Sequence, residues 1–167
     1  MLRKPKAPGE YYHVYNRGNN KREIFLDVFD YARFLLALLL MQSEEPVYKP
    51  SRLVSGFMKQ NVLPLTPAEV AGRIATREVQ LSAFAIMPNH FHLLVCEQSA
   101  GGIARYMKRL LGSYTKYSNT KRGMVGHVFQ GPYQFVHVED DDQLVYLSAY
   151  IHRNPRALLQ WRGKEHI

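Results

Sequence analysis

Apolar and polar residues alternate in four short segments of the chain and recur every three to four residues in several longer segments. Alternation is typical of strands, and the longer period is typical of helices. Strands are therefore expected at 11–16, 80–86, 90–97 and 134–138. Helices are expected at 27–42, from 67 to about 77, from about 99 to 120, and from about 141 to 153.

The segment between the first helix and the second strand departs from this pattern. Three prolines interrupt it, so we expect residues 43–66 to be irregular. A capping box formed by Thr66 and Glu69 predicts the short helix that follows. We interpret the whole stretch at about 43–78 as an insertion into the fold.

Without this insertion, the first six elements follow the order β-α-β-β-α-β, which is the order of the ferredoxin-like fold. That α+β fold has an antiparallel sheet with two helices on one face. The last helix, which carries two tyrosines, is then expected to cross the other face of the sheet. We expect residues 1–167 to form a single domain of this kind, because the length suits one hydrophobic core.

The charge of the chain indicates a polyanionic partner. Lysine and arginine number 22 against 14 acidic residues, which gives a formal net charge of +8 and favours binding of nucleic acid. The single cysteine, Cys96, excludes a disulfide framework and a cysteine-based zinc site. No signal peptide is visible, and the longest apolar stretch, 34–41, is too short to span a bilayer. We therefore expect a soluble, cytoplasmic protein with no membrane partner.

Two groups of cations are candidates for contacts with DNA phosphates. The first group lies in the turn after the first strand, and the second lies on the polar side of the long helix at about 99–120. The alternative for both groups is an ordinary solvated surface. The candidates are Arg17, Lys21 and Arg22 in the turn, and Arg105, Lys108, Arg109 and Lys116 on the helix.

Two histidines at the start of a predicted strand are candidate metal ligands. His90 and His92 flank Phe91, so their side chains point to the same face of the sheet. On the last helix, Tyr150 and Asn154 are four residues apart and lie on one side. Two imidazoles and an amide carbonyl oxygen would suit Mg²⁺ or Mn²⁺ completed by water and a phosphate oxygen.

Such a metal would act as a Lewis acid on a scissile phosphate, and Tyr150 would be the nucleophile. The resulting tyrosine ester would keep the energy of the phosphodiester, so that rejoining needs no ATP. Tyr146 is the second candidate nucleophile, because it lies one turn earlier on the same face.

Four stretches resemble a known family. Asn89–Val95 resembles the HUH motif (histidine, bulky apolar residue, histidine), and Tyr150–Pro155 resembles the tyrosine-helix motif of the single-tyrosine HUH transposases. Tyr12–Asn20 and Gly126–Gly131 resemble motifs of the REP-associated tyrosine transposases. The resemblance covers most of residues 11–158 outside the insertion.

This resemblance implies that His90, His92 and Asn154 bind the metal and that Tyr150 is the nucleophile. It also implies a substrate of single-stranded DNA, often with a hairpin from a repeated extragenic palindrome. Cleavage in that family leaves a 5′-phosphotyrosine and a free 3′-hydroxyl. The chain departs from the family pattern at Pro132 and Gln134, where an arginine and a lysine are often found.

Three readings therefore stay open from the sequence. The first is a metal-dependent endonuclease of the transposase type that nicks and rejoins single-stranded or hairpin DNA. The second is a domesticated relative that binds hairpin DNA with little or no catalysis. The third is a metal-dependent hydrolase in which Tyr150 is structural. The sequence does not decide between a monomer and a homodimer, because related enzymes include both.

Overall fold

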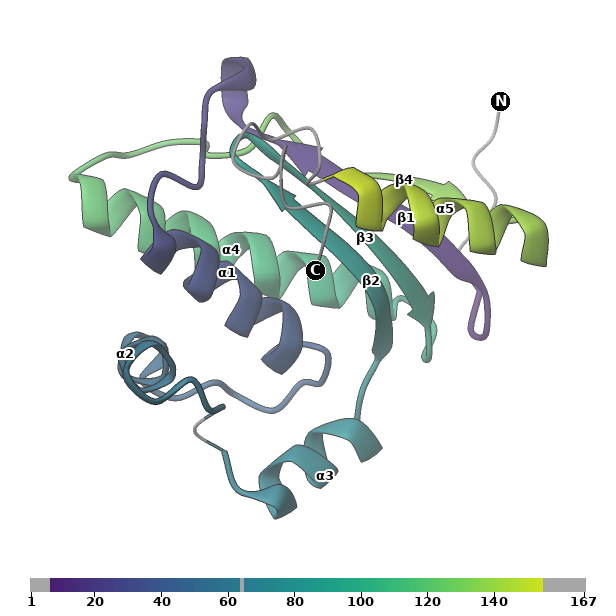
Figure 1. Cartoon of the computed structure of the whole chain (residues 1–167), viewed down its shortest axis with the longest axis horizontal. Coiled ribbons are helices and arrows are strands. Elements are labelled where there is room, and N and C mark those ends of the chain that lie inside the picture. Colours follow the sequence, from purple (N-terminus) through teal and green to yellow (C-terminus); the bar gives the residue numbers. More distant parts are fainter. Residues whose placement is uncertain (1–6, 64, 155–167) are drawn as a thin grey trace, which may run out of the picture.

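The computed structural model describes residues 7–63 and 65–154 (Figure 1). Residues 1–6, 64 and 155–167 lie outside the described residues, and Pro155 of the tyrosine-helix motif is among them. The strands are β1 (Tyr11–Arg17), β2 (Val79–Met87), β3 (His90–Glu97) and β4 (Gln134–His137). The helices are α1 (Val28–Leu40), α2 (Pro50–Gln60), α3 (Pro67–Ala75), α4 (Gly102–Arg122) and α5 (Asp141–Arg153), with a 3-10 turn at Asn19–Lys21.

The four strands form one antiparallel sheet in the order β2-β3-β1-β4. This is the strand order of the ferredoxin-like fold, so the predicted fold class is confirmed. The register between the two central strands places Tyr15 opposite His92 and Arg17 opposite His90. Segments that are more than seventy residues apart in the sequence therefore share one stretch of sheet.

The sheet has helices on both faces, and the two faces differ in character. Figure 1 shows α1 and α4 on one side and α5 on the other. On the first side, residues from the sheet and from both helices form the main core. The fully buried members of this core include Val14, Phe34, Leu38, Phe91, Leu93, Val95, Ile103, Met107, Leu110 and Tyr114. Among the described helices, none is both long and apolar enough to cross a membrane.

Helix α2 corrects the expectation that residues 43–66 are irregular. Its first residue is Pro50, and proline is favourable at the first position of a helix because no hydrogen bond needs its missing N–H there. Left-handed residues bound the helix at Lys49 and Asn61. Val54 packs against α1, where it covers Leu36. The insertion therefore extends the apolar contacts of α1 on the side of the molecule away from α5 (Figure 1).

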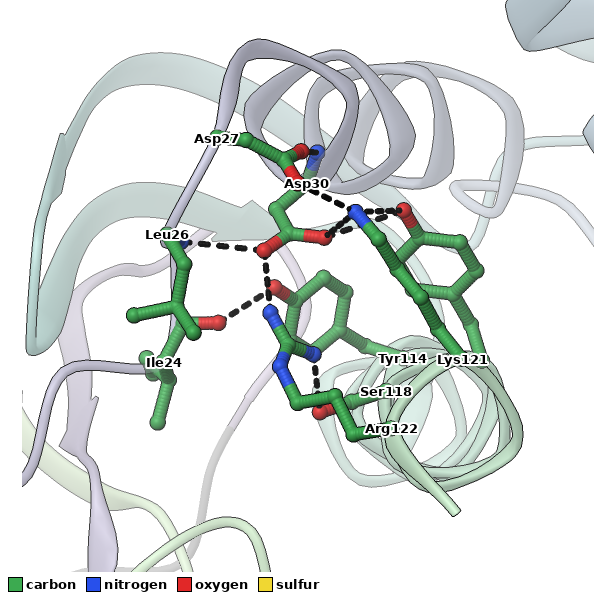
Figure 2. Close-up of polar contacts among 9 residues, drawn as sticks. Ile24, Leu26, Asp27, Asp30, Tyr114, Ser118, Lys121 and Arg122 are labelled. Atoms are coloured by element: carbon green, nitrogen blue, oxygen red, sulfur yellow. Dashed lines mark hydrogen bonds and ion pairs between the residues drawn. The ribbon is translucent and has the colours of Figure 1, made fainter.

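A buried carboxylate connects the start of α1 to the end of α4 (Figure 2). The side chain of Asp30 is fully buried and pairs with Arg122 and with Lys121, whose Nζ lies 2.8 Å from Oδ1. It also accepts hydrogen bonds from the backbone N–H of Leu26 at 2.9 Å and from the Tyr117 hydroxyl at 3.0 Å. Burial alone would raise the pKa of Asp30, but these donors and cations outweigh burial and hold the pKa below its usual value.

Candidate active site

The face of the sheet that carries α5 also carries the predicted metal ligands. His13, Tyr15 and Arg17 alternate along β1, and the register places them beside His90 and His92 of β3. A small apolar cluster anchors helix α5 on this face. Ile151 is the buried residue of the helix, and the other buried members come from the sheet and from the segment after β4. The cluster consists of Ile151 with Ala83, Ala85, Leu94 and Val138.

This anchoring places the tyrosine of α5 against the histidines. The rings of His90 and His92 lie with centroids 5.1 Å apart at an interplanar angle of 86°. The ring of Tyr150 meets His92 edge to face, with centroids 5.9 Å apart. Tyr146, one turn earlier, is 73% exposed, whereas Tyr150 is 44% exposed. The structure therefore brings His90, His92 and Tyr150 together, and of the two candidate nucleophiles on α5 it is Tyr150 whose ring contacts His92.

An open pocket of about 610 Å³ lies next to the rings of His90 and His92. Both histidines line it, together with two of the predicted phosphate contacts, Arg17 and Lys21. The Nε atom of Arg17 donates to the Gln130 side chain at 2.6 Å, which orients the guanidinium from the loop before β4. The remaining lining residues are Tyr15, Asn16, Asn89, Phe91, Gln130 and Gln134.

Each histidine has a hydrogen-bond partner for its Nδ1 atom. His90 Nδ1 lies 2.6 Å from Oδ1 of Asn89, and the Asn89 amide nitrogen donates to the Lys21 carbonyl. His92 Nδ1 lies 2.8 Å from Nε2 of His13. Burial lowers the pKa of His13 and of His90. Burial, together with the neighbouring imidazoles, lowers the pKa of His92 to about 4. All three rings are therefore neutral near pH 7.

The ring nitrogens of His90 and His92 fit a divalent metal. A neutral imidazole whose Nδ1 is held by a neighbouring side chain is the usual form of a histidine ligand, and His90 and His92 both meet this condition. In the described part of the chain, no group of three or more His, Cys, Asp or Glu side chains forms a metal site. The predicted third ligand, Asn154, lies at the C-terminal end of α5, four residues after Tyr150. The amide nitrogen of Asn154 donates to the Tyr150 carbonyl at 3.2 Å.

The predicted DNA contacts occupy different environments. Arg22 is exposed beside the pocket residue Lys21, and its guanidinium donates to the carbonyl of His127 at 2.9 Å. On α4, the guanidinium groups of two candidates are engaged with the buried carboxylate of Glu78 at the start of β2. These two are Arg105 and Arg109, and both are held in ion pairs. The other two, Lys108 and Lys116, are exposed and make no ion pair with any residue in the described ranges.

Sequence reasoning missed His13, Asn89 and Gln130 as members of the site. The alternation of β1 places His13 on the same face as Tyr15 and Arg17, which is the signal that was present. Its contact with His92 follows from the pairing register of β1 and β3, and a register between distant strands is not readable from one sequence.

Comparison with known proteins identifies the class to which this fold and site belong. The sequence model of the family described as IS200-like transposases matches residues 57–154, which are 98 of the 167 residues. The chain belongs to the IS200-like transposase family. The matched range includes His90, His92, Tyr150 and Asn154. A search of curated proteins gives no match.

The fold is shared with a solved structure of another protein. The chain is similar to a REP-associated tyrosine transposase bound to a REP hairpin, with a TM-score of 0.60 and 13% sequence identity, over 96% of this chain and 74% of that chain. A candidate transposase from Deinococcus radiodurans R1 matches with a TM-score of 0.42 and 15% identity, over 92% of this chain and 97% of that chain.

Proposed function

We propose that this protein is a metal-dependent endonuclease of the transposase type that nicks and rejoins single-stranded, hairpin-bearing DNA through Tyr150. The observation that carries the proposal is the ring contact between Tyr150 and His92 on the sheet face that also bears His90. Membership of the IS200-like transposase family supports the same reaction class. The similarity in fold to a hairpin-bound transposase supports DNA of this shape as the substrate.

The pocket beside the histidines suits a sugar–phosphate backbone. Arg17 and Lys21 supply positive charge at its wall, and Gln130 holds the Arg17 guanidinium in one orientation. Charged donors of this kind neutralise backbone phosphates without reading the base sequence. Their part in the reaction is to position one phosphodiester in front of the Tyr150 hydroxyl.

In the cleavage step, the Tyr150 oxygen forms a bond to the phosphorus as the bond from phosphorus to the 3′-oxygen breaks. The tyrosine loses its hydroxyl proton and the leaving 3′-oxygen gains one, so that the products are a 5′-phosphotyrosine and a 3′-hydroxyl. Rejoining reverses both bonds. A divalent metal held by His90, His92 and Asn154 would supply Lewis-acid polarisation of the scissile phosphate. The exposed position of Tyr150 leaves room for a DNA strand to approach it.

A covalent-trapping assay tests this proposal. The substrate is a hairpin with randomised single-stranded flanks, incubated with protein and Mn²⁺ and then run on a denaturing gel. In a 5′-phosphotyrosine the attached DNA carries the original 3′ end, so a 3′ label is expected to shift with the protein and a 5′ label is not. Wild type and the control Tyr146→Phe are expected to give the shifted band, whereas Tyr150→Phe and chelator-treated protein are not.

Each of the alternative results indicates a different activity or a different nucleophile for this protein. A band that is lost in Tyr146→Phe and kept in Tyr150→Phe moves the nucleophile by one helical turn. Cleavage without any covalent band indicates a hydrolase in which Tyr150 is structural. Salt-sensitive binding of the hairpin library without cleavage indicates a hairpin-binding protein, as the departures from the family pattern at Pro132 and Gln134 allow.

A further inference from the structure

A third histidine contacts the proposed metal site from the neighbouring strand. His13 lies on β1, and its Nε2 atom is 2.8 Å from Nδ1 of His92. The two rings are close to parallel and meet at their edges, with centroids 5.0 Å apart and an interplanar angle of 23°. Tyr15 packs against both rings, with its ring centroid 5.0 Å from that of His13 and 6.0 Å from that of His92. These contacts fix both imidazoles in place.

The contact of the other proposed metal ligand, His90, shows how a neighbouring side chain selects the tautomer of a histidine. The Asn89 carbonyl oxygen can only accept a hydrogen bond, so the short contact with His90 requires His90 to carry its proton on Nδ1. The direction of the Asn89 amide is fixed in turn, because its nitrogen donates to the Lys21 carbonyl. The Nε2 atom of His90 is therefore left with a lone pair and can bind a metal.

The contact of His92 is different, because its partner can either donate or accept. If Nε2 of His13 donates, His92 accepts on Nδ1, and a neutral His92 then carries its proton on Nε2 and cannot bind a metal there. If Nε2 of His13 accepts, His92 carries its proton on Nδ1, and its Nε2 has a lone pair. Only the second arrangement leaves both His90 and His92 able to bind a metal through Nε2.

We propose that His13 is a positioning residue that accepts the Nδ1 proton of His92 and so holds His92 in its metal-binding tautomer. This inference rests on the proposed function, because it assigns a task toward the metal. His13 would itself be neutral, with its own proton on Nδ1. Partners of this kind typically change metal affinity by about 10–100-fold when removed.

The first test measures Mn²⁺ binding rather than DNA cleavage. The dissociation constant for Mn²⁺ is determined from the electron paramagnetic resonance signal of the free ion. His13→Leu removes the acceptor and is expected to raise this constant by about 10–100-fold. His13→Gln keeps an acceptor oxygen near the position of Nε2 and is expected to bind within about threefold of wild type, since the hydrogen bond is restored. The matched control is His127→Leu, which removes an exposed histidine on the loop before β4.

Equal Mn²⁺ affinity in wild type and a folded His13→Leu variant would overturn the role of His13 while leaving the proposed metal site in place. Absence of Mn²⁺ binding by wild type would instead count against the proposed function. The two failures are therefore distinguishable.

The second test reads the tautomer directly in metal-free protein. Long-range proton–nitrogen correlation spectra distinguish a protonated ring nitrogen from one with a lone pair. We expect His92 to show a protonated Nδ1 and an unprotonated Nε2 in wild type and in His13→Gln. Because the measurement needs neither metal nor a destabilised variant, it tests the proposal even if His13→Leu does not fold. A spectrum with the proton of His92 on Nε2 would refute the proposal.

Discussion

Replacement of Asp30 by asparagine is expected to lower the free energy of unfolding by about 3 kcal/mol, which is a large share of the stability of an ordinary domain. The change keeps the volume of the side chain and removes its charge. Each carboxylate oxygen of Asp30 faces donors only: Arg122 and the Leu26 N–H at one oxygen, and Lys121 with the Tyr117 hydroxyl at the other (Figure 2). An amide nitrogen at either position would therefore face a donor.

The expected loss of stability depends on which of the two orientations of the introduced amide costs less free energy. At the oxygen that faces Lys121, the Tyr117 hydroxyl can turn to accept, and Lys121 still has Asp27 as a partner at 2.6 Å. Arg122, whose side chain is only 19% exposed, keeps a hydrogen bond but loses its charged partner. One hydrogen bond to a charged group is worth about 1.5–3 kcal/mol, and breaking a buried pair costs about 3–5 kcal/mol. A loss of about 3 kcal/mol corresponds to a decrease in Tm of about 6–12 °C.

Urea titration at pH 7 measures this loss, with Asp27→Asn as the matched control. Asp27 also pairs with Lys121, but its side chain is 45% exposed, and its other task is to cap α1 through the N–H of Asp30. Asparagine caps a helix as well as aspartate does, and an exposed ion pair is worth less than about 1 kcal/mol. A loss in Asp30→Asn no larger than the loss in Asp27→Asn would refute the view that the buried carboxylate is what Arg122 and Lys121 require.

The same variant predicts a pH dependence. The pKa of Asp30 is lower in the folded state than its usual value. Its contribution to stability is therefore fully present above the usual pKa of about 4 and is lost as the pH falls through the lower, folded value. We expect the difference between wild type and Asp30→Asn to be constant from pH 7 to about pH 5 and to shrink below about pH 4. A difference that grows toward low pH would contradict the sign of this shift.

Two further predictions separate DNA contacts from structural cations. Arg17→Gln and Lys21→Gln are each expected to weaken hairpin binding and to reduce the slope of log affinity against log salt by about 0.7–1, which fluorescence anisotropy at several KCl concentrations measures. Arg109→Gln is expected to leave this slope unchanged and to lower stability by about 2 kcal/mol in thermal melts, because Arg109 pairs with the buried Glu78. A changed salt slope in Arg109→Gln would show that Arg109 contacts DNA in spite of its ion pair with Glu78.

The elements that the sequence predicted well are those with a strong local signal. The alternation around Phe91 placed His90 and His92 on one face, and the helical period placed Tyr150 on the side of α5 that meets the sheet. Both depend on neighbours within a few residues. The sheet order followed from the order of the elements, because few topologies join β-α-β-β-α-β segments without crossing connections.

The features that the sequence did not predict involve contacts between distant segments. Arg105 and Arg109 lie on the polar side of α4, but whether a cation there meets solvent or a carboxylate depends on where Glu78 lies at the start of β2. The prolines in 43–66 predict an irregular segment, whereas Pro50 occupies the first position of α2, where proline favours the start of a helix. A capping box marked α3, but no side-chain cap marks α2.

The loop after β1 connects the two faces of the sheet and gives the Asp30 cluster a consequence for the site. On the helical side, Leu26 donates to Asp30 and the Tyr114 hydroxyl donates to the Ile24 carbonyl. On the same loop, the Ile24 N–H donates to the Pro88 carbonyl, two residues before His90. The hydrogen bond from the Asn89 amide nitrogen to the Lys21 carbonyl then orients the Asn89 side chain, whose oxygen selects the tautomer of His90. Hydrogen bonds that begin at the buried carboxylate of Asp30 thus help to hold His90, a proposed metal ligand, on the opposite face of the sheet.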